Sequence, residues 1–420
     1  MKKVVLAFLI LTITSPCLAK YSGGSGDPNN PFQIANVADL LNLAADTNDY
    51  NKCFIMTADI DLDPNLPGGK VFSTAVISPD KNNSNSIFDG NAFTSVFDGA
   101  GHKILNLTID TNGIANDYLG LFGDVNGGLV RNLGLQNINI TGGDDSRYIG
   151  GLAGIIEAKF FITEGGIMIR TCYIYNCFSN GSVADGNGAF DLGGLVGRAG
   201  PGGTILYCYS EVTIIGGNNS QEFGGLAGSS SRAVIYCCYS TGAVTAGDES
   251  ERLGGLVGLS GIGGNPVADC YSTGSVTGGD GSINLGGLVG YNNDGNIIGC
   301  YFLDGAGPHN GYGTPLTEDQ MKQKENYIGY GWDFIDETAN GPNDIWAICE
   351  GVSYPKLAWQ FVAGDSDNDK YVDFEDFAWI SNKWKQADSN LYCGGNDLTG
   401  DGWVDIFDIA VFADNWLAGY

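Results

Sequence analysis

The sequence has few of the residues on which common enzyme and nucleic-acid chemistries depend. Its 420 residues include two histidines, twelve prolines and 20 lysines or arginines, against 48 acidic residues, for a net charge of −28. The histidines, His102 and His309, lie far apart and do not form the H-E-x-x-H spacing of a zinc-protease helix. This acidic surplus argues against nucleic acid or an anionic membrane as the partner. A cation is the more natural partner.

Long apolar runs are also missing beyond the first residues. Residues 1–19 combine Lys2 and Lys3 with a short apolar run and a small-residue cleavage pattern that ends at Ala19, which predicts a signal peptide. No later run approaches the roughly 20 apolar residues that a spanning helix needs. We therefore expect a secreted, extracellular protein without a transmembrane segment. Association with the cell surface is compatible with this expectation.

Glycine, by contrast, is abundant and periodic. The phrase Gly-Gly-Leu-Ala/Val-Gly begins at Gly150, Gly193, Gly224, Gly254 and Gly286. A second phrase, Cys followed by an aromatic residue, keeps the same spacing. Each unit of about 30 residues holds short β-favouring runs that cannot bury their own apolar face, so neighbouring units must stack. The sequence predicts a mainly β fold, a right-handed parallel β-helix (solenoid) of about seven coils over residues 95–305, with Leu195, Leu226, Leu256 and Leu288 in one internal ladder.

These phrases resemble the GLUG repeats of large bacterial surface and secreted proteins, a resemblance that identifies a repeat and no particular chemistry. Residues 20–94 look like the leader usual in such proteins, and Asn36 begins a predicted amphipathic helix that would cover the open end of the β-helix. Residues 306–361 follow as a C-terminal cap or linker. In this segment Thr317 opens a capping box, and Trp332, Trp346 and Trp359 supply bulk for a plug over the last coil.

Cysteines recur once per coil at equivalent positions. Ten remain once the signal peptide is removed, and Cys208, Cys238, Cys270 and Cys300 share one register. An even count in an exported protein suggests disulfides, whereas a stacked ladder of small buried thiols suggests free cysteines. A metal site is a third interpretation, for which the candidates are Cys172, Cys177, Cys237 and Cys238.

An aromatic residue follows each of these cysteines. If the cysteines point inward, strand alternation turns the aromatic side chains outward as one stripe, formed by Phe178, Tyr209, Tyr239, Tyr271 and Tyr301. The structural interpretation is that stacked rings stabilise the sheet. The functional interpretation is a platform that binds sugar rings.

The last 57 residues contain two copies of a twelve-residue acidic pattern. Oxygen ligands at loop positions 1, 3, 5, 7, 9 and 12 match the six to eight oxygens that Ca²⁺ takes. In loop 1 these are Asp365, Asp367, Asp369, Tyr371 through its carbonyl, Asp373 and Asp376. In loop 2 they are Asp397, Thr399, Asp401, Trp403 through its carbonyl, Asp405 and Asp408. We expect two Ca²⁺ ions, with helices over 374–385 and 406–417.

Two such half EF-hands resemble a type I dockerin, the calcium-dependent module that joins secreted polysaccharide-degrading proteins to cohesin scaffolds. The resemblance assigns residues 364–420 to a small α-helical dockerin-like domain and implies a cohesin-like protein partner and a polysaccharide-degradation context. The sequence departs from the pattern at Lys370, which replaces the usual glycine, at Thr399, and at the bulky pairs Phe374-Glu375 and Ile406-Phe407.

The repeats themselves show little sign of catalysis. Asp185 and Asp191 are interpreted as turn residues, while Arg198, Arg232 and Arg252 are isolated in sequence. Near-uniform coils also lack the irregular coil that a catalytic site usually requires. The sequence predicts a non-catalytic extracellular β-helix module, surface- or carbohydrate-associated, attached through its dockerin-like domain. The alternatives are a polysaccharide lyase or glycoside hydrolase on the same fold, and a simple adhesin.

Overall fold

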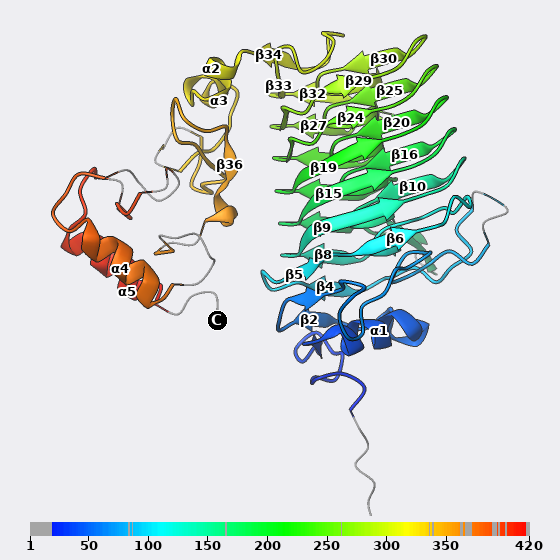
Figure 1. Cartoon of the computed structure of the whole chain (residues 1–420), viewed down its shortest axis with the longest axis horizontal. Helices are drawn as coiled ribbons and strands as arrows, with labels where there is room; N and C mark the ends of the chain where they lie inside the picture. Colours follow the sequence, from blue (N-terminus) through cyan, green and yellow to red (C-terminus); the bar gives the residue numbers. More distant parts are fainter. Residues whose placement is uncertain are drawn as a thin grey trace, which may run out of the picture.

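Short parallel strands of successive coils hydrogen-bond to one another in long ladders, as the repeat predicts (Figure 1). The computed structural model describes residues 19–416 except 83, 84, 86, 164, 165, 262, 336, 338, 339, 362, 363, 366–371, 389–392, 394 and 400. Within these residues the parallel β-helix makes about seven turns. The right-handed sense of the winding stays a prediction, and the signal peptide falls almost wholly outside the described residues.

Each regular coil passes through four sheets in turn. Sheet 1 holds β1 (Phe32–Ile34), β2 (Phe54–Met56), β4 (Val96–Asp98), β8 (Leu129–Arg131), β14 (Cys172–Tyr175), β18 (Gly203–Leu206), β22 (Val234–Tyr236), β27 (Pro266–Ala268) and β32 (Asn296–Ile298). Sheet 2 holds β3 (Ile60–Asp61), β5 (Lys103–Leu105), β6 (Thr108–Asp110), β9 (Gly134–Thr141), β15 (Phe178–Ala184), β19 (Tyr209–Ile215), β23 (Tyr239–Ser240), β24 (Val244–Thr245), β28 (Tyr271–Ser272), β29 (Val276–Thr277), β33 (Tyr301–Leu303) and β34 (Thr314–Leu316).

The remaining half of each coil is a tight return. Sheet 3 holds β10 (Arg147–Gly150), β16 (Phe190–Gly193), β20 (Gln221–Gly224), β25 (Glu251–Gly254) and β30 (Ile283–Gly286). Sheet 4 holds β7 (Phe122–Asn126), β11 (Ala153–Glu157), β17 (Val196–Ala199), β21 (Ala227–Ser231), β26 (Val257–Gly261) and β31 (Val289–Asn293). The glycine phrase links sheet 3 to sheet 4 in each of the five coils that have a sheet 3 strand.

The glycine phrase is required where the chain turns between these two sheets. A Cβ atom on Gly225 would lie 2.3 Å from the Gly255 carbonyl oxygen, and one on Gly228 would lie 2.6 Å from the Asp191 carbonyl carbon. Close backbone approach therefore excludes any side chain at these positions. The intervening leucines form the predicted internal ladder: Leu195, Leu226, Leu256 and Leu288 are fully buried.

Coiling begins earlier than the sequence predicts. β1 pairs with β2, and β2 pairs with β4, so the supposed leader already forms the first coils of the solenoid. These coils bury Ile34, Phe54 and Met56 without the glycine phrase, which is why the repeat pattern does not reveal them. The helix predicted at Asn36 is present as α1 (Val37–Ala45), followed by the 3₁₀ turn η1 (Thr47–Asp49), and it lies at the N-terminal end of the solenoid (Figure 1).

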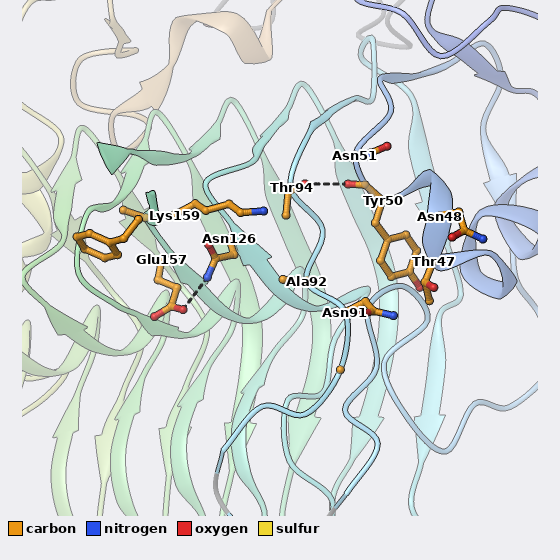
Figure 2. Close-up of a pocket in the computed structure, with 13 residues that line it drawn as sticks. Thr47, Asn48, Tyr50, Asn51, Asn91, Ala92, Thr94, Asn126, Glu157 and Lys159 are labelled. Atoms are coloured by element: carbon orange, nitrogen blue, oxygen red, sulfur yellow. Dashed lines mark hydrogen bonds between the residues drawn. The ribbon is translucent and has the colours of Figure 1, made fainter. Parts of the chain in front are cut away.

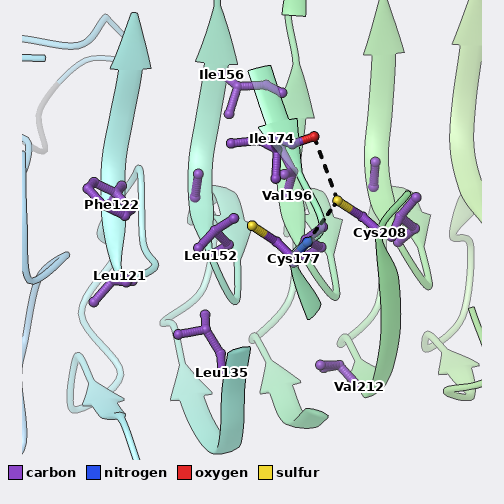
Figure 3. Close-up of a cluster of buried hydrophobic side chains, with 14 of the residues drawn as sticks. Leu121, Phe122, Leu135, Leu152, Ile156, Ile174, Cys177, Val196, Cys208 and Val212 are labelled. Atoms are coloured by element: carbon purple, nitrogen blue, oxygen red, sulfur yellow. Dashed lines mark hydrogen bonds between the residues drawn. The ribbon is translucent and has the colours of Figure 1, made fainter. Parts of the chain in front are cut away.

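The cysteine ladder is buried and free of disulfides. The backbone N–H of Cys177 donates to the sulfur of Cys208 at 3.3 Å, and the same contact recurs from Cys208 to Cys238 at 3.4 Å (Figure 3). Each thiol also donates to a nearby carbonyl, as Cys270 does to Ala268 at 3.0 Å. Burial raises the pKa of the Cys208 and Cys270 thiols well above the ordinary value. The ladder therefore consists of small core residues that satisfy the backbone at one corner of the coil.

The proposed cysteine metal site does not form. Cys172, Cys177 and Cys238 belong to the solenoid core, whereas Cys237 lies in a separate cluster on the outer side of the coil. The described cysteines instead contain one disulfide, between Cys349 and Cys393, which the sequence did not predict. This disulfide joins the segment after the solenoid to the C-terminal tail.

The segment after the solenoid first covers its end, where the Asn310 amide donates to the Leu285 and Val289 carbonyls, and its aromatic part then covers the side of the coils. It contains α2 (Glu318–Met321) with the predicted Thr317 capping box, α3 (Glu325–Ile328), the antiparallel pair β35 (Trp346–Ala347) and β36 (Lys356–Leu357), and η2 (Ala358–Gln360). In Figure 1 it runs back alongside the coils. The indole N–H of Trp359 reaches the Tyr207 carbonyl at 2.9 Å, several coils from the end. The aromatic residues on the flank of sheet 2 form one buried cluster with this segment.

The C-terminal tail forms two short helices around a small core. α4 (Phe374–Asn382) and α5 (Ile406–Asp414) begin at the predicted residues and end earlier than predicted. Val372, Ile380, Val404 and Phe412 are buried between them. Among the described residues, no helix has the length and apolar character needed to cross a membrane.

Thiol titration tests the cysteine assignment. The denatured, unreduced mature protein should expose eight free thiols, the count of free cysteines among the described residues. The folded protein should react slowly, because these cysteines are buried. Reduction should release two more thiols, from Cys349 and Cys393. A titre of six or fewer before reduction would show that neighbouring ladder cysteines are bridged.

Candidate functional sites

The second predicted calcium loop is ordered around two buried carboxylates. Asp397 at loop position 1 is 2% exposed, and Asp408 at position 12 is fully buried. Asp397 accepts hydrogen bonds from the backbone N–H of Asp401 at 3.2 Å and of Gly402 at 2.6 Å. Asp408 accepts from the N–H of Leu398 at 2.7 Å. The loop therefore folds around its first and last acidic ligands.

The remaining positions of loop 2 follow the expected pattern. Gly402 at position 6 has a φ of +93°, which glycine adopts without strain. Asp405 at position 9 caps α5 by accepting from the N–H of Phe407 at 2.8 Å. The Asp401 carboxylate accepts from the N–H of Trp403 at 2.9 Å, and the Thr399 hydroxyl donates to Asp397 at 3.1 Å. Four carboxylates and a hydroxyl on one short loop are hard oxygen donors that suit Ca²⁺.

Loop 1 is described only in part. Asp367, Asp369 and Tyr371 lie outside the described residues, as does Lys370. Asp365 and Asp376 are each 1% exposed, and the N–H of Asp373 donates to Asp376 at 2.8 Å, the same contact that Asp405 makes with Asp408 at 2.6 Å. Among the described residues, no three acidic, histidine or cysteine side chains converge as a metal-binding group. The two Ca²⁺ ions stay a prediction.

The predicted aromatic stripe forms, but it does not face solvent. Tyr209 and Tyr239 stack with their ring centroids 4.9 Å apart and 3° between the ring planes, and Tyr239 and Tyr271 stack at 5.0 Å. Trp332, Trp346 and Trp359 pack over the stripe. Tyr271 is 1% exposed.

The sugar-platform interpretation of Phe178, Tyr209, Tyr239, Tyr271 and Tyr301 is therefore wrong in this structure, because the C-terminal cap occupies the face that a sugar ring would need. The structural interpretation is supported: stacked rings join neighbouring coils and anchor the cap. The hydroxyl of Tyr271 donates to the Pro355 carbonyl at 2.6 Å, which ties the stripe to the cap by a polar contact as well.

An irregular coil exists, contrary to the sequence prediction. The antiparallel hairpin of β12 (Lys159–Thr163) and β13 (Gly166–Arg170) interrupts the coil between β11 and β14. A second excursion leaves sheet 4 after the bridge between Ile77 and Phe122 and returns at the bridge between Phe93 and Val125. Both insertions lie beside β7 and β11, and repeat phrases cannot reveal insertions that occur once.

These insertions enclose two adjoining cavities on the outer face of sheet 4. The larger, about 870 Å³, lies between residues 47–51, residues 90–94 and the hairpin, and Figure 2 shows its lining. The smaller, about 550 Å³, lies beneath residues 87–92 and is called the lateral pocket below. Asn126 and Glu157 line both cavities, and the Asn126 amide donates to Glu157 at 2.7 Å. The lateral pocket is lined also by Phe88, Tyr118, Asp124, Tyr148 and Arg198.

Strand register brings the charged residues of the lateral pocket together. Asp124 and Arg198 occupy one ladder of sheet 4, separated by Ile155 on β11. Glu157 pairs with Asn126, two residues along from Asp124 on the neighbouring strand. Strand spacing and rise place the Cα atoms of Asp124 and Glu157 roughly 8 Å apart. Asp124, Glu157 and Arg198, which are 33 to 74 positions apart in the sequence, thus line one cavity.

Burial dominates the electrostatics of the pocket. It raises the pKa of Asp124 well above the ordinary value, and the negative charge of Glu157 raises it further. Burial also raises the pKa of Glu157, against the opposing attraction of Arg198. A carboxyl group that stays protonated near neutral pH can donate a hydrogen bond as well as accept one.

The arginines interpreted as isolated have close partners. The guanidinium of Arg198 lies 5.8 Å from the ring centre of Tyr148. Arg252 contacts Glu222 at 2.7 Å and Glu251 at 3.1 Å. The repeat spacing could have revealed the contacts of Arg252, because four residues occupy equivalent positions on sheet 3: Tyr148, Asp191, Glu222 and Arg252.

Comparison with known proteins gives a fold and a partial relative. No family model matches the chain. A stretch of 176 residues is 32% identical to halomucin of Haloquadratum walsbyi, covering 35% of this chain and about 2% of that protein's length. The crystal structure of "a putative immunoglobulin A1 protease from Bacteroides ovatus" superposes with a TM-score of 0.55 and 18% identity, covering 81% of this chain and 96% of that chain. At this identity the likeness shows the β-helix fold alone.

Several acids interpreted as solvated turn residues are buried. Asp191 is fully buried, and Asp185 is 9% exposed between β15 and β16. Asp185 accepts from the N–H of Gly186 at 2.8 Å, while its second carboxylate oxygen is buried without a hydrogen-bond partner among the described residues. Burial, opposed by the Gly186 hydrogen bond, raises the pKa of Asp185 to about 8.

The buried carboxyl of Asp185 predicts a pH-dependent stability. Its pKa is higher in the folded state than in the unfolded chain, so folding favours the protonated form and loses stability as the pH rises from about 4 to about 8. Asp185→Asn keeps the acceptor for Gly186 without the charge. It should raise the melting temperature at pH 8 and change it little at pH 4. The exposed Asp280→Asn is the control, and an equal effect of both substitutions in thermal melts would contradict the assignment.

Proposed function

We propose that this protein is a secreted, non-catalytic β-helix module that associates with a surface or a carbohydrate and is attached to a protein partner through a calcium-dependent, dockerin-like tail. The observation that carries the proposal is loop 2, where Asp397 and Asp408 are buried at the first and last positions of a loop otherwise built from oxygen donors and one positive-φ glycine. Buried carboxylates repel one another in a small domain, and a cation that binds between them offsets this repulsion and stabilises the fold.

The outer surface of the tail supports a docking role. Phe374, Ile406 and Phe407 stand at the positions where dockerins contact cohesins, and they are 75%, 62% and 63% exposed. Their bulk suits an apolar partner surface, which is a change from the small polar pairs usual at these positions. The Cys349–Cys393 disulfide would transmit load from such a partner to the cap and, through the aromatic stripe, to the coils.

Calcium titration of the mature protein tests the tail. We expect two Ca²⁺ ions per chain by isothermal titration calorimetry, with a gain in helical circular dichroism that a chelator reverses. Asp408→Asn should weaken the loop 2 site roughly tenfold or more, because it removes a charged ligand from position 12. Asp414→Asn on the same helix removes an exposed carboxylate and should leave both sites intact. Absence of Ca²⁺ binding to the parent protein would refute the calcium-dependent attachment.

A glycoside hydrolase is the second candidate, and the observation that favours it is the lateral pocket. Asp124, with its raised pKa, would protonate the leaving oxygen while Glu157 activates water or attacks the sugar carbon. Water would then supply the hydroxyl and the proton that complete the two products.

A reducing-end assay separates the two candidates. The enzyme interpretation predicts new reducing ends from polysaccharide incubated with the parent protein and none with Asp124→Asn or Glu157→Gln. The binding-module interpretation predicts no release above the blank for any of the three proteins. Release by the parent that both variants retain would exclude the lateral pocket as the catalytic site.

A further inference from the structure

We propose that the lateral pocket is a binding site for an uncharged saccharide, whose hydroxyl groups bond Asp124, Glu157 and Arg198 and whose ring packs against the partly exposed Phe88. This inference rests on the proposed carbohydrate association and names the site and the class of ligand. It places that site on the outer face of sheet 4, away from the aromatic stripe that the sequence suggested.

Unused hydrogen-bonding capacity points to a ligand. Asp124 is 4% exposed, yet its Oδ1 atom has no hydrogen-bond partner among the described residues, and the same is true of Arg198 Nε. Buried polar atoms are normally paired, so a site that keeps both an acceptor and a donor open suits a ligand that supplies both. A sugar hydroxyl donates one hydrogen bond and accepts others.

The geometry of the strands matches a ligand with several such groups. Asp124 and Arg198 are two strands apart in one ladder, so their Cα atoms lie about 10 Å apart, with Glu157 on the strand between them. Neighbouring hydroxyls on one or two sugar rings can reach these three side chains together.

The balance of charge favours an uncharged ligand. Burial favours the uncharged form of Asp124, and the positive charge of Arg198 is offset by the nearby carboxylates of Glu157 and Glu222, so the pocket has no strong preference for an ion of either sign. The chain carries a net charge of −28, which repels acidic polysaccharides at a distance. Polar groups of both kinds without a net charge are what a neutral sugar requires.

The partly exposed ring of Phe88 supplies the apolar contact that sugar recognition also needs, and the two tyrosines beneath hold it in place. Phe88 meets Tyr118 edge-on at 5.2 Å between ring centroids, and Tyr118 stacks on Tyr148 at 4.8 Å. Cavities of 300–1,000 Å³ with convergent polar groups are typical of small-molecule sites, and both cavities fall within that range at about 550 and 870 Å³. Because the two cavities share Asn126 and Glu157, an extended chain can pass from one to the other.

The test measures binding of the full-length mature protein to soluble polysaccharides by affinity electrophoresis and calorimetry. The uncharged probes are xyloglucan, galactomannan and mixed-linkage β-glucan, and the acidic probes are polygalacturonate and alginate. Arg198→Gln and Asp124→Ala should each weaken binding of an uncharged probe roughly tenfold, because each removes a hydrogen bond to a charged or strongly polar group. The matched controls are Arg232→Gln and Asp280→Ala, whose exposed parent residues lie outside the pocket, and they should leave affinity unchanged.

Each other outcome overturns the proposal. Failure of every uncharged probe to bind, binding of acidic probes only, or equal affinity of the pocket variants and their controls would each refute the site. If Arg198→Gln lowers the melting temperature, Phe88→Ala, on the partly exposed side of the pocket, provides the second measurement. Calcium titration of the same variants separates this result from the proposed attachment, because loss of saccharide binding with intact Ca²⁺ binding refutes the pocket alone.

Discussion

The structure depends on one steric constraint, the contact of backbone with backbone where each coil turns from sheet 3 to sheet 4. At Gly225 and Gly228 a single methyl group would collide with the main chain of adjacent coils at 2.3 Å and 2.6 Å. The two sheets therefore approach more closely than side chains permit, and the residues facing this contact adopt positive φ, as Tyr148 does at +59° and Asp191 at +61°. That conformation is costly for residues other than glycine and persists only because the stacked coils impose it.

The regular part of this architecture could be predicted because the spacing of a repeat identifies which residues of successive coils are neighbours. Leu256 and Cys238 lie where their spacing placed them, since a ladder buries the same position in every coil. Features that occur once left no such record. The start of coiling at Phe32 lacks the glycine phrase, the hairpin at Lys159 is an insertion, and the partner of Cys349 is set by how the tail folds back. The two acidic loops were recognisable as calcium-loop candidates because the spacing of their residues is local, and Ca²⁺ binding by them stays a prediction.

Exposure was the property that sequence predicted least well. Alternation correctly turned Tyr239 and Tyr271 out of the solenoid core, but it contains no information on whether a distant segment will cover them. The cap covers them because Trp332 and Trp346 pack on the stacked aromatic surface of sheet 2. A side chain that points away from the solenoid core is thus buried in a second core, beneath the C-terminal cap. The predicted sugar platform therefore forms the contact between the coils and the cap.

The two insertions explain why a candidate binding site lies beside β7 and β11. In the cysteine ladder, backbone N–H groups and thiols find their hydrogen-bond partners in the neighbouring coils. The ladder of sheet 4 also continues through β7, β11 and β17, but there the two insertions stand over its outer face, and Asp124 and Arg198 each keep a polar atom without a hydrogen-bond partner among the described residues. The strands of sheet 4 fix the positions of these side chains, and the insertions form the walls of the cavity around them. Two insertions beside regular strands are therefore sufficient to create a preorganised polar pocket without any change in the fold.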